Sequence, residues 1–331
     1  MTTTTPEKSP AGELGTVIVS RPRFEGSNIC TWIGFKHVMY LVEEAVLEHL
    51  RRTGLAPRRL YEEHGLGLDI VDGDARILTA LHMDDEVRTQ VIPQAGDDSG
   101  ELVLRTRTSV ERPGEPRSVL AATASVRAVF RLDDDAPQPP DGVPAVVRRI
   151  ERGGAVGVDA PLSYAPPAPL EGRGIVGDTE SGLAAPGANA IVWRWRIPYF
   201  YCHYSRRLQH SGYLRLMEEV VDLFLAERGI SIRTLVDGRR WIPVVPRARV
   251  EILAEALMEE ELYVVFTVEE IFKRATYTAR MECYVRRGGQ YVCTARGRIT
   301  HGYAEILDRR DWRLVEFDEP TLAALRGDAA G

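Results

Sequence analysis

Cysteine is scarce in this 331-residue chain, which contains four. They are Cys30, Cys202, Cys283 and Cys293. No two of them form a Cys-x-x-Cys pair, so the sequence has neither the usual ligand spacing of a structural zinc site nor a disulfide framework. Free thiols fit a reducing compartment, and we expect a cytoplasmic protein without a bound metal.

The chain also lacks long apolar runs and an excess of basic residues. No run approaches the ~18 apolar residues that a membrane-spanning helix requires. Residues 1–13 open with the polar stretch MTTTTPEKSP and resemble a flexible tail more than a signal peptide. The net charge is −6, whereas nucleic-acid binders usually show a basic face. We therefore expect neither a membrane nor a nucleic acid as a partner.

Several catalytic motifs are missing as well. The sequence has no Gly-x-Ser-x-Gly elbow, no phosphate-binding Gly-x-x-x-x-Gly-Lys-Ser/Thr loop and no His-Glu-x-x-His pair. The sequence also has no Gly-x-Gly-x-x-Gly loop between a predicted strand and a predicted helix. These absences argue against serine hydrolases, nucleotide-dependent enzymes and zinc proteases, and we expect no cofactor.

What the chain does contain is a repeat. MYLVEEAVLEHL, from Met39 to Leu50, returns as LRLMEEVVDLFL, from Leu214 to Leu225. Residues of the second copy lie 175 positions after their counterparts, as Glu218 lies after Glu43. The apolar spacing predicts one amphipathic helix in each copy. The chain is therefore predicted to be an internal duplication.

The correspondence continues past the helices. Gly54 and Gly229 each follow the predicted helix, where a residue without Cβ suits a left-handed cap. Two late strands of the second copy flank residues 286–289, a glycine-containing hairpin turn. The matching turn of the first copy, residues 112–116, is longer, so the offset falls to 173 beyond it. A repeat that survives such a length change is hard to attribute to chance.

Composition then divides the chain. Residues 133–190 are rich in Pro, Gly and Ala and lack the periodicity of a packed core, which indicates a linker. The predicted organisation is a flexible tail (1–13), a first unit (14–132), the linker (133–190), a second unit (191–308) and a C-terminal extension (309–331).

Each copy is predicted to contain a strand, a short loop, one long helix and about four antiparallel strands, which is an α+β unit. The stretch Tyr213–Glu219, YLRLMEE, resembles the helix start of the 4-hydroxybenzoyl-CoA thioesterase type, and Thr300–Tyr303, THGY, closes the last strand. The order of elements resembles the hotdog fold, in which a curled antiparallel sheet wraps a central helix. Two copies resemble the double-hotdog enzymes of acyl thioesters, which implies a pseudodimer.

The loop before the second helix departs from that family. The family commonly carries Asp-x-x-Gly-His-Val-Asn-Asn there. In this chain His203 stands at the Asp position, Arg206 and Arg207 at the Gly-His pair, and Gln209 and His210 at the paired Asn positions. The usual aspartate is absent, so its mechanism cannot be transferred unchanged.

Two carboxylates are the first catalytic candidates. At about 100° per residue, Glu218 and Glu43 border the apolar face of their helices, whereas the next residue of each pair points among polar neighbours. A carboxylate at that border loses part of its hydration, which suits a general acid or base. The alternative interpretation is an edge carboxylate paired with an arginine.

Two histidines are the second pair of candidates. His203 and His210 precede the second helix, whose N-terminal N–H groups could stabilise a thioester oxyanion. Asn28 and Phe35 occupy the matching positions of the first copy, so histidine chemistry is confined to one loop. The alternative is a structural role, which is commoner for a lone histidine.

The remaining candidates are weaker, and each has packing or solvation as its alternative role. Residues that could orient a carbonyl or bind a pantetheine arm are His37, Tyr40, Gln209 and Tyr213. Trp32 could line an acyl pocket, and Arg206 and Arg207 could meet the phosphates of CoA or of a carrier-protein phosphopantetheine.

The resemblance implies an acyl-thioester hydrolase that acts on an acyl-CoA or acyl-carrier-protein substrate, with a place in fatty acid or polyketide metabolism. One alternative is a dehydratase or hydratase of 3-hydroxyacyl or enoyl thioesters, in which His203 pairs with Glu43 of the opposite unit. Another is a non-catalytic partner that binds an acyl carrier. Homo-oligomers of the pseudodimer are compatible with each of these.

Overall fold

The computed structural model describes residues 15–94, 101–112, 114, 117–132, 150–152, 174–176, 182–184, 187–202 and 204–328. The chain divides into unit 1, Met1–Gly153, and unit 2, Gly154–Gly331. The division falls within the segment predicted to be a linker. In the described part of the chain, no helix is long and apolar enough to cross a membrane.

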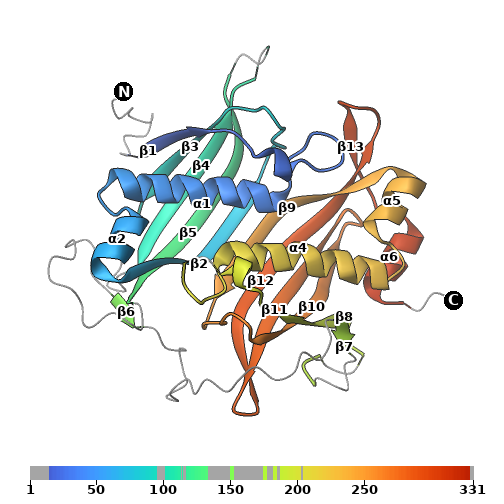
Figure 1. Ribbon diagram of the computed structural model, residues 1–331. Helices are drawn as coiled ribbons and strands as arrows, with labels where there is room; N and C mark the ends of the chain where they lie inside the picture. The colour runs from blue at the N-terminus through green and yellow to red at the C-terminus, as the bar shows by residue number, and fades with distance from the viewer. Residues whose placement is uncertain are drawn as a thin grey trace. The chain divides into compact units, whose positions relative to one another are not determined.

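Unit 1 is an antiparallel sheet with one long helix on it (Figure 1). The strand order is β1-β3-β4-β5-β2, and the short β6 runs parallel to β5. The elements in chain order are β1 (Thr16–Ser20), the 3-10 turn η1 (Phe24–Gly26), α1 (Phe35–Arg52), α2 (Pro57–His64), β2 (Leu66–Ile77), β3 (Val87–Pro93), β4 (Leu102–Val110), β5 (Val119–Leu132) and β6 (Ile150–Arg152).

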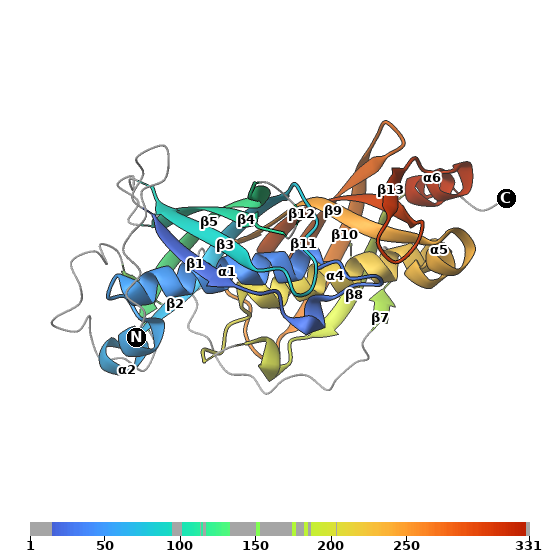
Figure 2. The ribbon, with the colours of Figure 1, turned by 90° about the horizontal axis from the view of Figure 1, so that it is seen from above.

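Unit 2 repeats this plan and extends it. Its strand order is β9-β12-β11-β10-β8-β7, and β13 pairs with β12. The elements are β7 (Gly174–Val176), β8 (Ala190–Arg196), the 3-10 turn η2 (Tyr199–Tyr201), α4 (His210–Glu227), α5 (Ile232–Arg239), β9 (Trp241–Ile252), β10 (Glu261–Phe272), β11 (Thr276–Arg287), β12 (Gln290–Ile306), β13 (Trp312–Val315) and α6 (Glu319–Arg326). Viewed from above, β13 and α6 lie beside α5 (Figure 2).

The duplication holds at the level of strand register. Val110 pairs with Val119 in unit 1, and Val285 pairs with Val292 in unit 2. The first members of these pairs differ by 175 positions and the second by 173, as the sequence predicts. The strand register also shifts at the same place in both sheets. The shift follows Thr108 of β4 in unit 1 and Cys283 of β11 in unit 2.

Local turn signals are confirmed in the backbone. Gly54 and Gly229 follow the long helices with φ of 86° and 73°, in the left-handed region that glycine adopts without steric cost. The β11–β12 hairpin turns at Gly288 and Gly289, with φ of 56° and 81°. Two positive φ values fit the type I′ turn that matches strand twist.

Three sequence expectations need correction. Each long helix begins four residues before the repeated stretch that predicted it, because α1 starts at Phe35 and α4 at His210. A short helix, α2 or α5, follows each long one where a strand was expected. The C-terminal extension is also part of unit 2, since β13 and α6 fold against it.

The predicted linker contains structure where it is described. The short strand β6 pairs with β5, and β7 pairs with β8. Leu183, Ala184 and Ala188 pack with Val192 and Tyr263 of the unit 2 sheet. Apolar residues of this Ala-rich segment therefore contribute to a small hydrophobic cluster despite lacking periodicity.

An ion pair holds the acidic turn of each unit, which is formed by residues 84–86 in unit 1 and 259–261 in unit 2. Arg112 lies 2.7 Å from the Asp85 carboxylate in unit 1, and Arg287 lies 2.8 Å from the Glu260 carboxylate in unit 2. Each arginine also donates to a backbone carbonyl of the preceding loop. The acidic turns and the loops that lead into them are thus anchored to the neighbouring hairpin.

Candidate functional site

Both long helices begin without a side-chain cap. Gly34, which has no side chain, precedes α1, and Gln209, whose side chain makes no capping hydrogen bond, precedes α4. The Gln209 amide instead donates to Ser205 Oγ at 3.1 Å. By contrast, Ser231 caps α5 and Asp318 caps α6. The first turns of α1 and α4 also contain no acidic residue, so their positive dipole ends can attract a developing negative charge.

The loop before α4 is held to the β9–β10 connection. Leu208 N donates to Ala256 O at 2.8 Å, and Met258 N donates to the Arg206 carbonyl at 2.7 Å. The same pair of backbone hydrogen bonds recurs in unit 1. Because these bonds fix the chain on the N-terminal side of α4, the first-turn N–H groups have a defined direction.

The catalytic candidates of unit 2, His210 and Glu218, lie far apart along α4. His210 is the first residue of α4 and is 5% exposed, whereas Glu218 is half-buried eight positions later. At 1.5 Å per residue, the two lie roughly 12 Å apart along the helix axis. They therefore do not form an acid–base pair within this helix. His203 lies outside the described residues.

The candidates of unit 1 also lie on their helix. His37 is buried in the first part of α1, with its ring edge-on to Tyr40 at 5.2 Å between centroids. Glu43 is half-buried and Glu44 is exposed, which agrees with the predicted border position of Glu43. The six positions between His37 and Glu43 amount to roughly 9 Å along the axis.

A reciprocal exchange of large and small residues marks the start of the two helices. In unit 1 a Cβ at Gly26 would lie 2.6 Å from His37 Cγ. In unit 2 the equivalent positions are Tyr201 and Gly212, where a Cβ on the glycine would lie 3.1 Å from the Tyr201 carbonyl and 3.3 Å from its ring. One bulky side chain fits between the 3-10 turn and the helix in each unit, supplied from opposite sides.

Other predicted site residues are tied into the fold. Tyr213 is fully buried, and burial raises the pKa of its phenol. Trp32 is buried beside the backbone bridge that it forms with His82. Arg207 lies 3.7 Å from the buried Glu255 carboxylate. Arg206 is exposed on the same loop.

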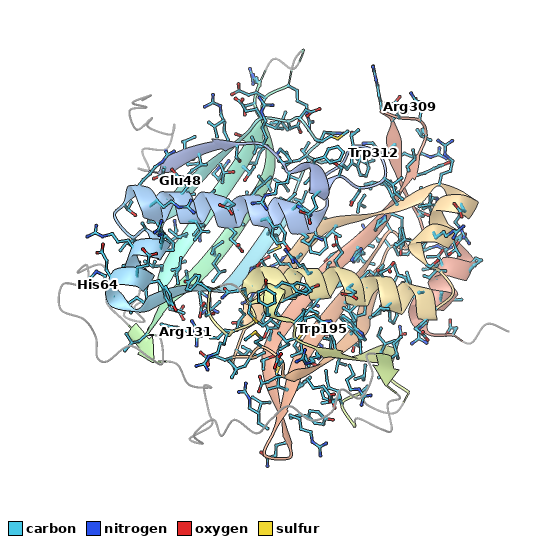
Figure 3. All side chains as sticks on the ribbon, in the orientation of Figure 1. Glu48, His64, Arg131, Trp195, Arg309 and Trp312 are labelled. Atoms are coloured by element: carbon cyan, nitrogen blue, oxygen red, sulfur yellow. The ribbon has the colours of Figure 1, made fainter. Side chains whose placement is uncertain are left out.

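Sequence reasoning missed an aromatic and cationic group beside α4. Trp195 of β8, labelled in Figure 3, is edge-on to Tyr201 at 4.9 Å, and the Arg215 guanidinium of α4 lies 5.3 Å from the Tyr201 ring. The alternation of Trp and Arg along β8 was the available signal. Burial also raises the pKa of the neighbouring Cys202 thiol to about 11, so it is not a nucleophile at neutral pH.

Comparison with known proteins agrees with this geometry. Residues 198–325 match the family model of the thioesterase-like superfamily, which spans α4 and the loop before it. A putative oleoyl thioesterase from Lactobacillus plantarum superimposes with a TM-score of 0.57 at 11% identity, over 88% of this chain and 96% of that one. The 12:0-ACP thioesterase from Umbellularia californica gives 0.56 at 12% identity, over 91% and 98%.

This chain has the double-hotdog fold. The superposition extends over both units, and the family match includes the YLRLMEE stretch on which the resemblance was based. The predicted fold class is therefore confirmed. Comparison with curated proteins gives no match.

Proposed function

We propose that this double-hotdog protein hydrolyses acyl thioesters. The observation that carries the proposal is the thioesterase-like match over residues 198–325, which includes the uncapped start of α4. The solved thioesterases with the same fold act on acyl-carrier-protein or oleoyl substrates according to their names, and this supports an acyl-CoA or acyl-carrier-protein substrate here.

The chemistry follows from the start of α4. N–H groups of its first turn polarise the thioester carbonyl and stabilise the oxyanion that forms. Water attacks the carbonyl carbon, and a base takes one of its protons. The carbon–sulfur bond then breaks, and the departing thiolate receives that proton, which leaves a carboxylic acid and a free thiol.

We assign the water-activating base to the His203–His210 loop rather than to Glu218. His210 lies in the first turn of α4, next to the N–H groups, whereas Glu218 is roughly 12 Å further along the axis. A general base must come within hydrogen-bond reach of the proton it removes. Glu218 and Glu43 are left as groups that bind or orient the substrate.

Two features bear on the thioester carrier and the compartment. Arg206 is exposed beside the proposed site and can meet a phosphate, and Arg207 lies 3.7 Å from the Glu255 carboxylate. All four cysteines are free thiols, which supports a reducing cytoplasm. A role in fatty acid or polyketide metabolism is the biological setting that we propose.

The test is product analysis by mass spectrometry after incubation with acyl-CoA, 3-hydroxyacyl-CoA and enoyl-CoA thioesters. Hydrolysis releases free acid and CoA, whereas a dehydratase or hydratase changes the acyl mass by one water and keeps the thioester. His210→Ala should lower kcat by at least ~100-fold if the imidazole is the base. Glu219→Gln, on the same helix, is the matched control and should retain activity. An unchanged substrate panel would refute the proposed activity and favour a non-catalytic acyl-carrier partner.

A further inference from the structure

Unit 2 buries polar aromatic residues at positions where unit 1 has apolar ones. His301 of β12 pairs with Tyr277 of β11, and their rings stack at 5.2 Å with 10° between planes. Two residues further along β12, Tyr303 is also buried. We call His301, Tyr277 and Tyr303 the His301 cluster. By the strand register, the counterparts in unit 1 are the half-buried Leu102 for Tyr277 and the buried Ala128 and Phe130 for His301 and Tyr303.

The polar atoms of the His301 cluster lie in the interior of unit 2, and the phenol groups of Tyr277 and Tyr303 interact with each other. Both ring nitrogens of His301 are buried without a hydrogen-bond partner among the described residues. Burial lowers the pKa of His301 to about 3, so the imidazole is neutral. Buried polar groups without partners destabilise a fold, and unit 1 shows that apolar residues fill the same positions. The cluster is therefore not required for packing.

The C-terminal extension covers the His301 cluster. Phe317 packs on Tyr303 at 5.5 Å and on Tyr277 at 6.3 Å. The start of α6 is held by Arg239, 2.6 Å from Asp318, and by Arg274, 2.6 Å from Glu319. The cover closes this end of unit 2, which keeps the cluster away from solvent.

Nearer to the centre of α4, the helix-facing side of the same sheet has a glycine packed against two methionine side chains. Gly297 of β12 lies on the same face as His301, and a Cβ there would lie 2.2 Å from Met217 Cε and 3.1 Å from Met281 Cε. Unit 1 has Ala124 in place of Gly297 and Val42 in place of Met217. Flexible thioethers over a glycine can change rotamer to admit a chain, whereas a β-branched residue over an alanine is stiff.

We propose that the acyl group enters between α4 and this face of the unit 2 sheet, and that the His301 cluster binds an uncharged oxygen, a hydroxyl or a ketone, at its far end. This inference rests on the proposed thioesterase function. Met217 and Met281 move aside to let the chain pass, and the tyrosine hydroxyls and the neutral imidazole donate to or accept from the oxygen. The substrate class is an acyl thioester oxygenated away from the thioester carbon.

The test is binding of thioether analogues, which cannot be hydrolysed, to the full-length protein by calorimetry. S-alkyl-CoA and S-(ω-hydroxyalkyl)-CoA are compared in a series from hexyl to dodecyl. The wild type should bind the hydroxylated analogue of the fitting length about tenfold more tightly, which corresponds to one well-formed hydrogen bond. The variant Tyr277→Leu/His301→Ala/Tyr303→Phe, which carries the unit 1 residues, should lose this preference.

Two further variants keep the test decisive. Tyr303→Phe removes one hydroxyl with the shape retained and should lower the preference without a fall in Tm. Gly297→Ala should lower Tm and weaken binding of both analogues, because its Cβ meets Met217. Addition of Met217→Val restores the pair found in unit 1 and should recover Tm but not binding. An equal preference in the wild type and the triple variant, or ordered water alone against the cluster in a crystal of the complex, would overturn the inference.

The outcomes also separate this inference from the proposed activity. If thioesters are hydrolysed but the analogues bind without preference, only the recognition of oxygen fails. If no thioester is cleaved, the hydrolase proposal fails, and the binding ratio still decides whether the His301 cluster recognises an oxygenated chain.

Discussion

Unit 1 contains an ion pair that unit 2 does without. Arg131 Nε on β5 lies 3.0 Å from Asp69 Oδ2 on β2, with side chains 7% and 11% exposed; Figure 3 labels Arg131. The equivalent residues of unit 2 are Val244 and Ala304. A hotdog sheet therefore folds with either an ion pair or apolar residues at this place, which makes the pair a clean test of buried-charge energetics.

Replacement of one charged residue should lower the free energy of unfolding strongly, whereas replacement of both should change it little. Asp69→Val or Arg131→Met alone leaves a buried charge without its partner, at a cost of about 3–5 kcal/mol. For a unit of roughly 150 residues, each kcal/mol lowers Tm by ~2–4 °C, so Tm should fall by ~6–20 °C. The double variant removes both desolvation penalties and should lie within ~1 kcal/mol of the wild type.

The assay is a double-mutant cycle by denaturant unfolding and scanning calorimetry of the full chain. The coupling between the two substitutions should reach several kcal/mol, because each single variant suffers from the charge that the other removes. The less buried pair of Arg127 with Asp72, 3.2 Å apart and with side chains 31% and 12% exposed, is the control and should show a smaller coupling. Additive effects, or single variants that cost less than ~1 kcal/mol, would refute the reasoning.

Three other predictions follow from local geometry. Gly26→Ala should destabilise unit 1 by ~1–3 kcal/mol, because its Cβ would meet His37. Addition of His37→Ala should remove that destabilisation, as measured by chemical denaturation. The idea fails if the effects of the two substitutions are additive. Arg240 ends α5 with φ of 57°, where unit 1 has a glycine, so Arg240→Gly should raise stability by up to ~1 kcal/mol, and a lower Tm would contradict this. Since burial lowers the pKa of His301 from 6.5 to about 3, only the unfolded chain takes up this proton between those pH values. Unfolding free energy should then fall by ~1.4 kcal/mol per pH unit on acidification, and urea titrations of His301→Ala should show a shallower slope.

Much of the fold could be predicted because its signals are local. The repeated apolar spacing of Met39–Leu50 and Leu214–Leu225 identifies both helices, and glycines identify the turns after them. The starts of the helices could not be predicted, because Gly34 and Gln209 give none of the side-chain capping signals on which such predictions depend. The helix starts that lack a side-chain cap are also where we propose the chemistry.

The candidate site was predicted less completely. Comparison of the two copies predicted the chemistry to lie beside α4, but it could not show that His210 belongs to the helix or that Tyr213 is fully buried. The group of Tyr201, Trp195 and Arg215 was missed, because its members come from three different elements. A site of this kind becomes visible only when strands and helices are brought together.

By itself, the sequence determined that the chain is duplicated, that each copy has a long amphipathic helix and where the two copies differ in length. Those features depend on residues a few positions apart, whose spacing fixes which face is apolar. Tertiary structure decided what each difference between the copies means. The exchange of Gly26 and His37 for Tyr201 and Gly212, and the polar cluster at His301, depend on contacts between residues far apart in the chain. Their burial and missing partners are properties of packing, which no local pattern contains.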